Sequence, residues 1–241
     1  MFIANWKMNG SLPMIKDWLK VVGQEMESKT QSNCILCPPV CFLSIASELI
    51  QAHDLKVLLG AQDIDENGKT SLTGGISGSM LKELDTKYVI IGHSERRKKF
   101  DERDSLLLKK IESALENSLK VIFCVGETQS EKEKGLTKQT LDKQLEVIKD
   151  SDASNIMIAY EPVWAIGSGQ SAKISYIREI HEHISNKMKL RHKEFLGVVY
   201  GGSVNSSTSK EIFSLDHVEG LLIGGASLEP KEFSTIALNS F

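Results

Sequence analysis

Short apolar runs of strand length recur eight times along this sequence, and segments with helical spacing separate them. Each run is continuously apolar, not alternating, which is typical of strands in a parallel sheet that is covered on both faces. Alternation of such strands with helices indicates an α/β fold. The predicted strands are Phe2–Trp6, Cys34–Cys37, Lys56–Gln62, Tyr88–His93, Lys120–Glu127, Asn155–Glu161, Leu196–Gly201 and Gly220–Gly225.

The segments between the runs carry apolar residues at helical spacing. Examples are Leu107, Ile111, Ala114 and Leu115, then Leu141, Leu145 and Ile148, then Ile177, Ile180, Ile184 and Met188. Ser11 is expected to cap a helix, because the nearby Pro13 is tolerated only in a first turn. Asp101 is expected to cap the helix that follows it.

Length alone leaves one domain or two open, since the chain has 241 residues and domains average roughly 150, although α/β barrels of roughly 200–250 residues form one domain. No linker-like stretch divides the sequence. We therefore predict one domain over residues 1–241, a single (β/α)8 barrel of eight parallel strands surrounded by helices. A doubly wound sheet more often has five or six strands and a glycine-rich turn after the first, which Trp6–Gly10 lacks.

The chain carries 29 basic and 32 acidic side chains, a formal net charge of −3. This balance argues against nucleic acid or anionic membranes as partners, since binding either requires a surplus of Lys and Arg. The sequence contains neither a secretory signal pattern nor an apolar run near the roughly 20 residues of a membrane span. Cys34, Cys37, Cys41 and Cys124 are too few for a disulfide framework, so we expect a cytoplasmic protein.

Polar residues follow the predicted strands, where a barrel of this kind carries its chemistry. Paired glycines follow the last two strands, at Gly201-Gly202 and Gly224-Gly225, and they let backbone N–H groups approach a phosphate closely. Other strands end near Lys7, His93 and Glu161. An ammonium, an imidazole and a carboxylate together can remove a proton next to a carbonyl and stabilise the enediolate that forms.

Five blocks of this sequence resemble the triosephosphate isomerase family. They are Asn5–Gly10, Gly92–Arg97, Ala159–Gly167, Tyr200–Val204 and Gly224–Leu228, and they occur in the family's order. The resemblance implies a TIM barrel and a homodimeric enzyme of glycolysis and gluconeogenesis that needs no cofactor or metal. It also implies that the enzyme interconverts dihydroxyacetone phosphate and D-glyceraldehyde 3-phosphate by glutamate-mediated proton transfer through an enediolate.

The resemblance assigns a role to each matching position. Glu161 is the base, His93 is a neutral donor to the carbonyl oxygen, Lys7 supplies positive charge and Asn5 donates a hydrogen bond. Glu95 is expected within reach of Lys7 or the substrate. The residues expected to bind the substrate are Asn5, Lys7, Gly167, Ser203, Gly224 and Gly225.

The segment Pro162–Ala172 is predicted to be a lid that keeps water from the enediolate. It begins at Pro162, has an apolar centre that includes Trp164 and Ile166, and ends in a flexible tip at Gly167, Ser168 and Gly169. Tyr200 and Ser203 resemble the residues that latch the closed lid. Thr73 resembles the tip of the loop that projects from one subunit into its partner's site.

The sequence departs from the family pattern at three positions. Gly75 stands where the family usually has glutamate, so an ion pair between subunits with Arg96 is expected to be missing. Gln170 and Ser171 replace the basic residue and threonine often seen late in the lid, which would alter its opening rate.

Several motifs have simpler interpretations. Gly167–Ala172 fits a dinucleotide fingerprint but does not open directly from a strand, and His93-Ser94-Glu95 lacks the cysteines of zinc deaminases. Cys34 and Cys37 are predicted to be buried small hydrophobes that point to opposite faces of a strand. His181 and His183 face differently on a helix, and solvent exposure is expected. The basic run 96–99 is interpreted as a solvated helix start or an interface.

Two other functions remain open from the residues alone. A Schiff-base aldolase would use Lys7 as its nucleophile. A phosphate-binding barrel without activity would bind its ligand and leave it unchanged.

Overall fold

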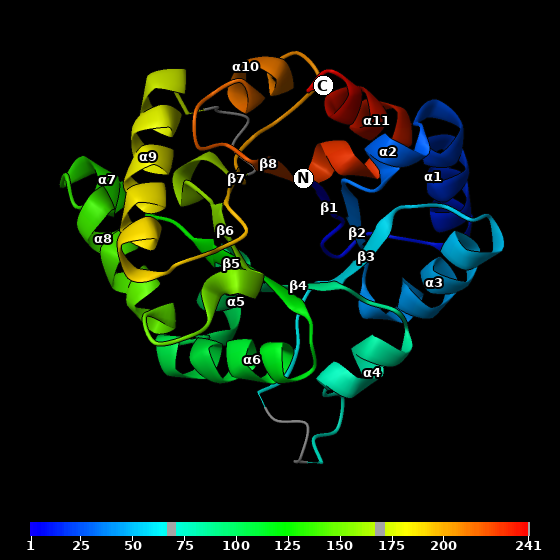
Figure 1. The fold of residues 1–241 in the computed structure, drawn as a ribbon, viewed down its shortest axis with the longest axis horizontal. Helices are drawn as coiled ribbons and strands as arrows, with labels where there is room; N and C mark the ends of the chain where they lie inside the picture. The colour runs from blue at the N-terminus through cyan, green and yellow to red at the C-terminus, as the bar shows by residue number, and fades with distance from the viewer. Residues whose placement is uncertain (67–70, 167–171, 241) are drawn as a thin grey trace.

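The computed structural model describes residues 1–66, 71–166 and 172–240. Parallel strands close into a barrel in chain order, with β1 paired to both β2 and β8, and helices form a ring around it (Figure 1). The strands are β1 (Phe2–Asn5), β2 (Cys34–Cys37), β3 (Leu58–Ala61), β4 (Tyr88–Ile91), β5 (Lys120–Val125), β6 (Ile156–Tyr160), β7 (Val198–Tyr200) and β8 (Gly220–Ile223). The predicted (β/α)8 barrel is confirmed, and most strands are shorter than predicted.

Helices follow the strands and cover the outer face of the barrel. The α-helices are α1 (Leu12–Glu25), α2 (Ser28–Gln31), α3 (Leu43–Ala52), α4 (Gly78–Glu83), α5 (Ser94–Phe100), α6 (Asp104–Glu116), α7 (Gln129–Glu133), α8 (Thr137–Leu145), α9 (Ile174–Arg191), α10 (Ser209–Phe213) and α11 (Pro230–Leu238). Short 3-10 turns are η1 (Val40–Phe42), η2 (Glu146–Ile148), η3 (Ala153–Asn155), η4 (Val163–Ala165) and η5 (Gly225–Leu228).

The strands separate two apolar cores, because successive side chains on a strand point to opposite faces. Phe2 and Ala4 belong to a large core that includes helix residues, so this core lies between strands and helices. Ile3 and Ile90 belong to a smaller core whose buried members lie on strands, which places it inside the barrel. Both faces of each strand are therefore buried, as the continuous apolar runs predict.

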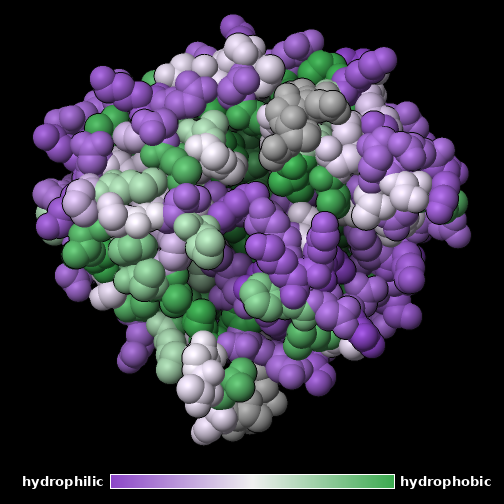
Figure 2. Space-filling view, turned by 180° about the vertical axis from the view of Figure 1, so that it is seen from behind, coloured by the Kyte–Doolittle hydropathy of each residue, from purple (hydrophilic) through white to green (hydrophobic). Residues whose placement is uncertain are grey.

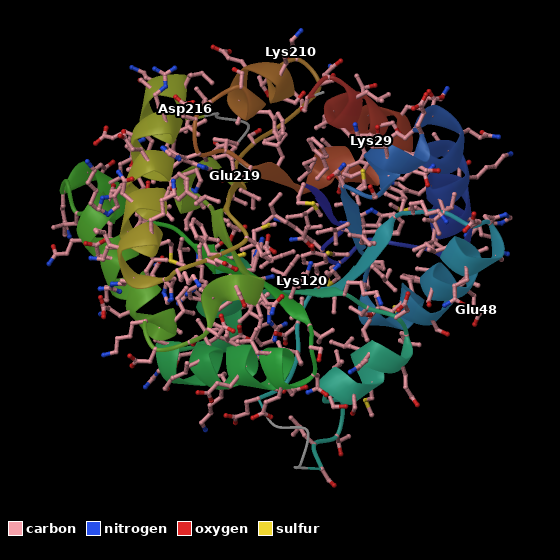
Figure 3. All side chains as sticks on the ribbon, in the orientation of Figure 1. Lys29, Glu48, Lys120, Lys210, Asp216 and Glu219 are labelled. Atoms are coloured by element: carbon pink, nitrogen blue, oxygen red, sulfur yellow. The ribbon has the colours of Figure 1, made fainter. Side chains whose placement is uncertain are left out.

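Charged side chains lie mainly on the outer ring. Figure 3 shows Glu48 on α3 and Lys210 on α10 at the rim of the molecule, whereas Lys120 and Glu219, at the amino ends of β5 and β8, lie nearer the centre. Among the described residues, we find no helix of the length and apolar character that crossing a bilayer requires.

Local signals give one correct and one wrong helix cap. The Ser11 hydroxyl accepts a hydrogen bond from the Met14 N–H and caps α1, as predicted. Asp101 does not cap α6, because it adopts a left-handed conformation with φ of 51° and ends α5 instead. Helix α6 begins later, with Arg103 at the capping position.

The two cysteines of β2 are buried in different cores. Cys34 belongs to the outer core and Cys37 to the interior one, which confirms that they point to opposite faces. Both are free thiols. Their spacing therefore reflects packing on the two sides of one strand.

His181 is fully buried, so the expectation of solvent exposure is wrong for this residue. It lies on the face of α9 that packs against the barrel, between Tyr160 of β6 and Tyr200 of β7. Its Nδ1 lies 2.9 Å from the His217 carbonyl oxygen, which can only accept, so Nδ1 carries the proton. His183 is partly buried, and its Nε2 lies 2.9 Å from an Asp142 carboxylate oxygen.

We predict that His181 makes stability pH-dependent. Burial lowers its pKa to about 4, whereas in the unfolded chain it is about 6.5. The unfolded state therefore binds more protons between these values, and stability falls as the pH drops from 6.5 to 4. The linked free energy is about 3 kcal/mol. His181→Asn, which does not titrate here, should flatten this part of the stability profile in urea unfolding series, whereas His53→Asn at an exposed site should not. An unchanged slope in His181→Asn would refute the assignment.

Candidate active site

A cavity of about 390 Å³ opens at the carboxyl ends of the strands. Side chains and loops that are far apart in sequence line it, because the closed parallel sheet brings all these strand ends to one rim. Of the residues predicted for the site, the cavity lining includes Asn5, Lys7, His93, Glu161, Ile166, Ser203, Gly224 and Gly225. The structure therefore brings these predicted residues together around one cavity.

The Glu161 side chain follows β6 and is almost completely buried. Its Oε1 lies 2.9 Å from His93 Nε2, and its Oε2 accepts a hydrogen bond of 3.3 Å from the Ser94 N–H. Two glycines make room for it. A Cβ at Gly126 would lie 1.8 Å from the Glu161 carbonyl oxygen, and one at Gly201 would lie 2.9 Å from Glu161 Cγ. A side chain at Gly126 would displace the Glu161 backbone, and one at Gly201 would displace the Glu161 side chain.

His93 caps the amino end of α5, and its Nδ1 accepts a hydrogen bond of 3.3 Å from the Glu95 N–H. An atom that accepts from a backbone N–H has no proton of its own, so this contact selects the neutral imidazole with its proton on Nε2. Burial and Lys7 lower the pKa of His93, but the Glu161 carboxylate outweighs them and raises it. A substrate that drew Glu161 away would remove this effect and favour the neutral form.

Lys7 projects its ammonium group into the same cavity from a strained backbone, with φ of 51°. Strain of this kind persists where surrounding contacts hold it. The Asn5 side chain accepts from the Lys7 N–H at 3.1 Å, and Gln62 Nε2 donates to the Lys7 carbonyl at 2.9 Å. Lys7 Nζ lies 2.8 Å from Glu95 Oε1, and this ion pair lowers the pKa of Glu95 despite partial burial, which raises it.

The loop after β8 forms another wall of the cavity, next to Lys7. A Cβ at Gly225 would meet open space, and one at Gly224 would lie 3.5 Å from Lys7 Cε. This loop is held from behind, because Trp18 of α1 donates from Nε1 to the Ser227 carbonyl at 2.9 Å. The Ser227 hydroxyl in turn donates to the Gly224 carbonyl at 2.7 Å. The main chain around Gly224 and Gly225 is therefore fixed and sterically open to a ligand.

Glu127 binds the first part of the predicted lid, a role that the sequence did not indicate. Its carbonyl accepts from the Val163 N–H at 3.1 Å, and its carboxylate accepts from Trp164 Nε1 at 2.8 Å. Tyr160 and Tyr176 donate to the same buried carboxylate at 3.1 Å and 2.9 Å. Hydrogen bonds to one fully buried glutamate thus hold the start of the predicted lid in place.

The remaining predicted residues occupy different places. Glu95 lies beside Lys7 at the edge of the site. Tyr200 is buried, and burial raises its pKa to about 12; its hydroxyl faces the main chain of Ala172 without a hydrogen bond of normal geometry. Thr73 is exposed and does not line the cavity of its own chain. Gly167, Ser168, Gly169, Gln170 and Ser171 lie outside the described residues.

Gln62 is a second residue whose role the sequence did not reveal. Its amide donates to the Lys7 and Cys37 carbonyls, both at 2.9 Å, and so joins the ends of β1, β2 and β3. Its position directly after a strand was the available signal. Within the described ranges, no group of three or more His, Cys, Asp or Glu residues is arranged to hold a metal ion.

The rim of this (β/α)8 barrel carries a buried carboxylate that faces an imidazole, a lysine beside them and sterically open glycine loops. This combination is typical of barrel enzymes that move protons on small anionic substrates. Comparison with known proteins defines the family. The family model described as triosephosphate isomerase matches residues 1–240.

Individual relatives agree with this result. Triosephosphate isomerase from Polynucleobacter asymbioticus is 39% identical, covering 97% of this chain and 96% of its own. The enzyme of that name from Vibrio vulnificus is 36% identical, covering 98% and 94%. A crystal structure of triosephosphate isomerase from Bartonella henselae superposes with a TM-score of 0.88 at 36% identity, over 99% and 98% of the two chains. The chain belongs to the triosephosphate isomerase family and is an isomerase.

We predict that Tyr176→Phe destabilises the protein by about 2 kcal/mol, because it removes a hydrogen bond to a buried carboxylate. Thr137→Val is the matched control, since the Thr137 hydroxyl contacts the Tyr176 hydroxyl at 3.0 Å and not the carboxylate. Its cost should be about 1 kcal/mol or less. Urea unfolding measures both, and an equal cost for the two variants would contradict the importance of the charged acceptor.

Proposed function

We propose that this chain interconverts dihydroxyacetone phosphate and D-glyceraldehyde 3-phosphate with Glu161 as the base. The observation that carries the proposal is the position of the Glu161 carboxylate, buried and 2.9 Å from the proton-bearing Nε2 of His93. A buried carboxylate at this position can reach a proton on the carbon next to a carbonyl, while the imidazole reaches the carbonyl oxygen.

The reaction proceeds by proton transfer between the two carbons and between their two oxygens. Glu161 takes a proton from the carbon next to the carbonyl, the C–H electron pair forms the carbon–carbon double bond, and negative charge develops on the carbonyl oxygen. His93 Nε2–H, the Lys7 ammonium and the Asn5 amide stabilise that oxygen. The hydroxyl on the first carbon gives up its proton, the former carbonyl oxygen gains one, and the His93 imidazole mediates this exchange between the two oxygens. Glu161 returns its proton to the neighbouring carbon as the new carbonyl forms on the first carbon. Glu95 acts through Lys7, whose ammonium it orients at 2.8 Å.

The phosphate binds at the other side of the cavity, against Ser203, Gly224 and Gly225, with Gly167 from the lid. The open space at Gly225 and the nearness of Gly224 to Lys7 support this placement. Backbone N–H groups supply most of the contacts and Lys7 supplies the charge. The residues 162–172 close over the bound substrate, and Tyr200 and Ser203 hold the closed lid at its carboxyl end.

An aldolase mechanism at Lys7 receives no support from this geometry. A Schiff base requires the uncharged amine, whereas Glu95 pairs with the ammonium form. No cofactor takes part in the proposed reaction.

A homodimer completes the proposed enzyme. Large hydrophobic side chains are exposed around the loop that carries Thr73: Met8, Val40, Leu72, Met80 and Phe100. The lower left of Figure 2, on the side of α3 and α4, shows a broad hydrophobic area. Exposed patches of this kind mark protein contacts. We place the partner's Thr73 loop against this surface, beside Lys7.

We place the enzyme in the cytoplasm and in glycolysis and gluconeogenesis. All four cysteines are free thiols, and Cys41 is exposed, which suits a reducing compartment. The substrates are small phosphorylated metabolites, and neither nucleic acid nor a membrane is a proposed partner.

The decisive test is Glu161→Gln, which keeps the shape of the side chain and removes the base. We expect kcat/KM in a coupled assay with glyceraldehyde 3-phosphate, without added metal or nucleotide, to fall about 10³-fold or more. Thermal unfolding should show a folded protein. Glu182→Gln, an exposed carboxylate on α9, should keep full activity. Near-normal turnover in Glu161→Gln would overturn the assignment, and an inactive natural chain would overturn the function.

The dimer is tested by sedimentation equilibrium, which should give about twice the chain mass of 26.7 kDa. Leu72→Asp should shift the protein toward the monomer, because a charge in an apolar contact is costly to bury. Leu190→Asp is the control, since Leu190 is also highly exposed but lies on α9, away from the Thr73 loop. A monomeric natural chain at micromolar concentration would contradict the proposal.

A further inference from the structure

Four charged side chains form a closed ring beside the site. The Arg96 guanidinium lies 2.6 Å from Asp63 and 2.9 Å from Glu102. Lys110 Nζ lies 2.7 Å from Asp63 and 2.8 Å from Glu102. Each cation therefore contacts both carboxylates, each carboxylate contacts both cations, and the formal charges of the ring sum to zero.

The ring is largely shielded from water. Lys110 and Glu102 are almost fully buried, Asp63 is 15% exposed and Arg96 is 30% exposed. Loss of one partner from such a group leaves a buried charge without compensation, whereas loss of an opposite pair does not. The stability of the protein therefore depends on the balance of charge in the ring as well as on the individual contacts.

Asp63 connects this ring to the two segments that carry the proposed catalytic side chains, namely the segment of Lys7 and the start of α5. It directly follows Gln62, whose amide holds the strained Lys7 backbone. Through Arg96 it reaches the first turn of α5, where the Arg96 N–H donates to the His93 carbonyl and Glu95 pairs with Lys7. Arg96 is fixed further by stacking 4.7 Å from the centre of the Phe100 ring.

The contact between Asp63 and Arg96 is also relevant to the glycine at position 75. The resembling family usually has a glutamate there, with an expected ion pair to Arg96 of the other subunit. Gly75 offers no carboxylate, whereas Asp63 and Glu102 of the same chain both contact the Arg96 guanidinium.

We propose that Asp63 is a positioning residue that supplies, from within the chain, the carboxylate that Arg96 requires. It thereby holds His93 and Glu95 at the start of α5 in register with Lys7. The proposal rests on the proposed function, because the groups it positions are those assigned to the proton transfer. The glycine loops assigned to the phosphate follow β7 and β8 and contribute no side chain to the ring.

The test compares Asp63→Asn with the natural dimer. We expect kcat to fall about tenfold, because a small displacement of His93 and Lys7 weakens stabilisation of the transition state. KM should change by less than kcat, because the backbone N–H groups that supply most of the phosphate contacts are untouched. Both proteins are assayed at concentrations where sedimentation shows the same oligomeric state. The control is Glu66→Gln, which breaks an exposed ion pair to Lys109. Like the contact between Asp63 and Lys110, this pair joins the loop after β3 to helix α6. Glu66→Gln should change neither kcat nor KM.

The double variant Asp63→Asn/Lys110→Met separates positioning from stability. It removes one negative and one positive charge, so its thermal stability should return toward that of the natural chain, while kcat should stay low because Arg96 still lacks Asp63. The proposal is overturned if kcat of Asp63→Asn lies within twofold of the natural value. It is also overturned if the double variant recovers kcat together with stability.

A readout that does not need turnover distinguishes this inference from the function itself. The imidazole 15N NMR signals of His93, assigned by their loss in His93→Gln, should shift in Asp63→Asn and stay unchanged in Glu66→Gln. An inactive natural chain would refute the proposed function, yet this arm would still decide whether Asp63 positions His93. Identical His93 spectra in the natural chain and Asp63→Asn would refute the inference.

Discussion

Closure of the parallel sheet is the constraint on which the rest of the molecule depends. Phe2 pairs with Cys34 on one side and with Leu221 on the other, so the first strand is fixed by the second and by the last. No strand can slip along its neighbour without breaking both of its ladders. Because all strands run in one direction, this register brings Lys7, His93 and Glu161 to one rim although more than 150 positions separate the first and the last.

The charge of the site is local, which explains how an acidic chain can bind an anionic substrate. Among the described residues that line the cavity, Lys7 alone carries a fixed positive charge. Arg96 and Lys110 are bound by carboxylates in the neighbouring ring and leave no surplus charge there. The net charge of −3 therefore says little about the substrate, since in the proposed site one lysine and the backbone of two glycine loops supply the attraction.

The sequence was sufficient for the strands, the barrel and most of the cavity lining, because these depend on short-range pattern and on one topological rule. The apolar periodicity marks each strand, and the rule that barrel chemistry lies at strand ends gathers Asn5, His93 and Glu161. Burial of His181 could not be predicted, because it depends on Tyr160 and Tyr200 from other strands. Asp101 was misread because a left-handed residue that ends one helix looks, in sequence, like a cap for the next.

The residues whose roles the sequence did not reveal contact the segments that carry the proposed reacting groups, and not the substrate. These residues are Gln62, Glu127 and Asp63. Each contacts a backbone or charged group from a distant segment, and the neighbouring sequence does not indicate which segment that is. Each holds something that would otherwise relax: the strained Lys7, the first turn of the lid, and the start of α5. Strained or mobile elements at a site persist only where surrounding contacts fix them. A barrel whose loops supply the chemistry therefore needs a second set of polar residues, and in this chain that set follows directly after β3 and β5.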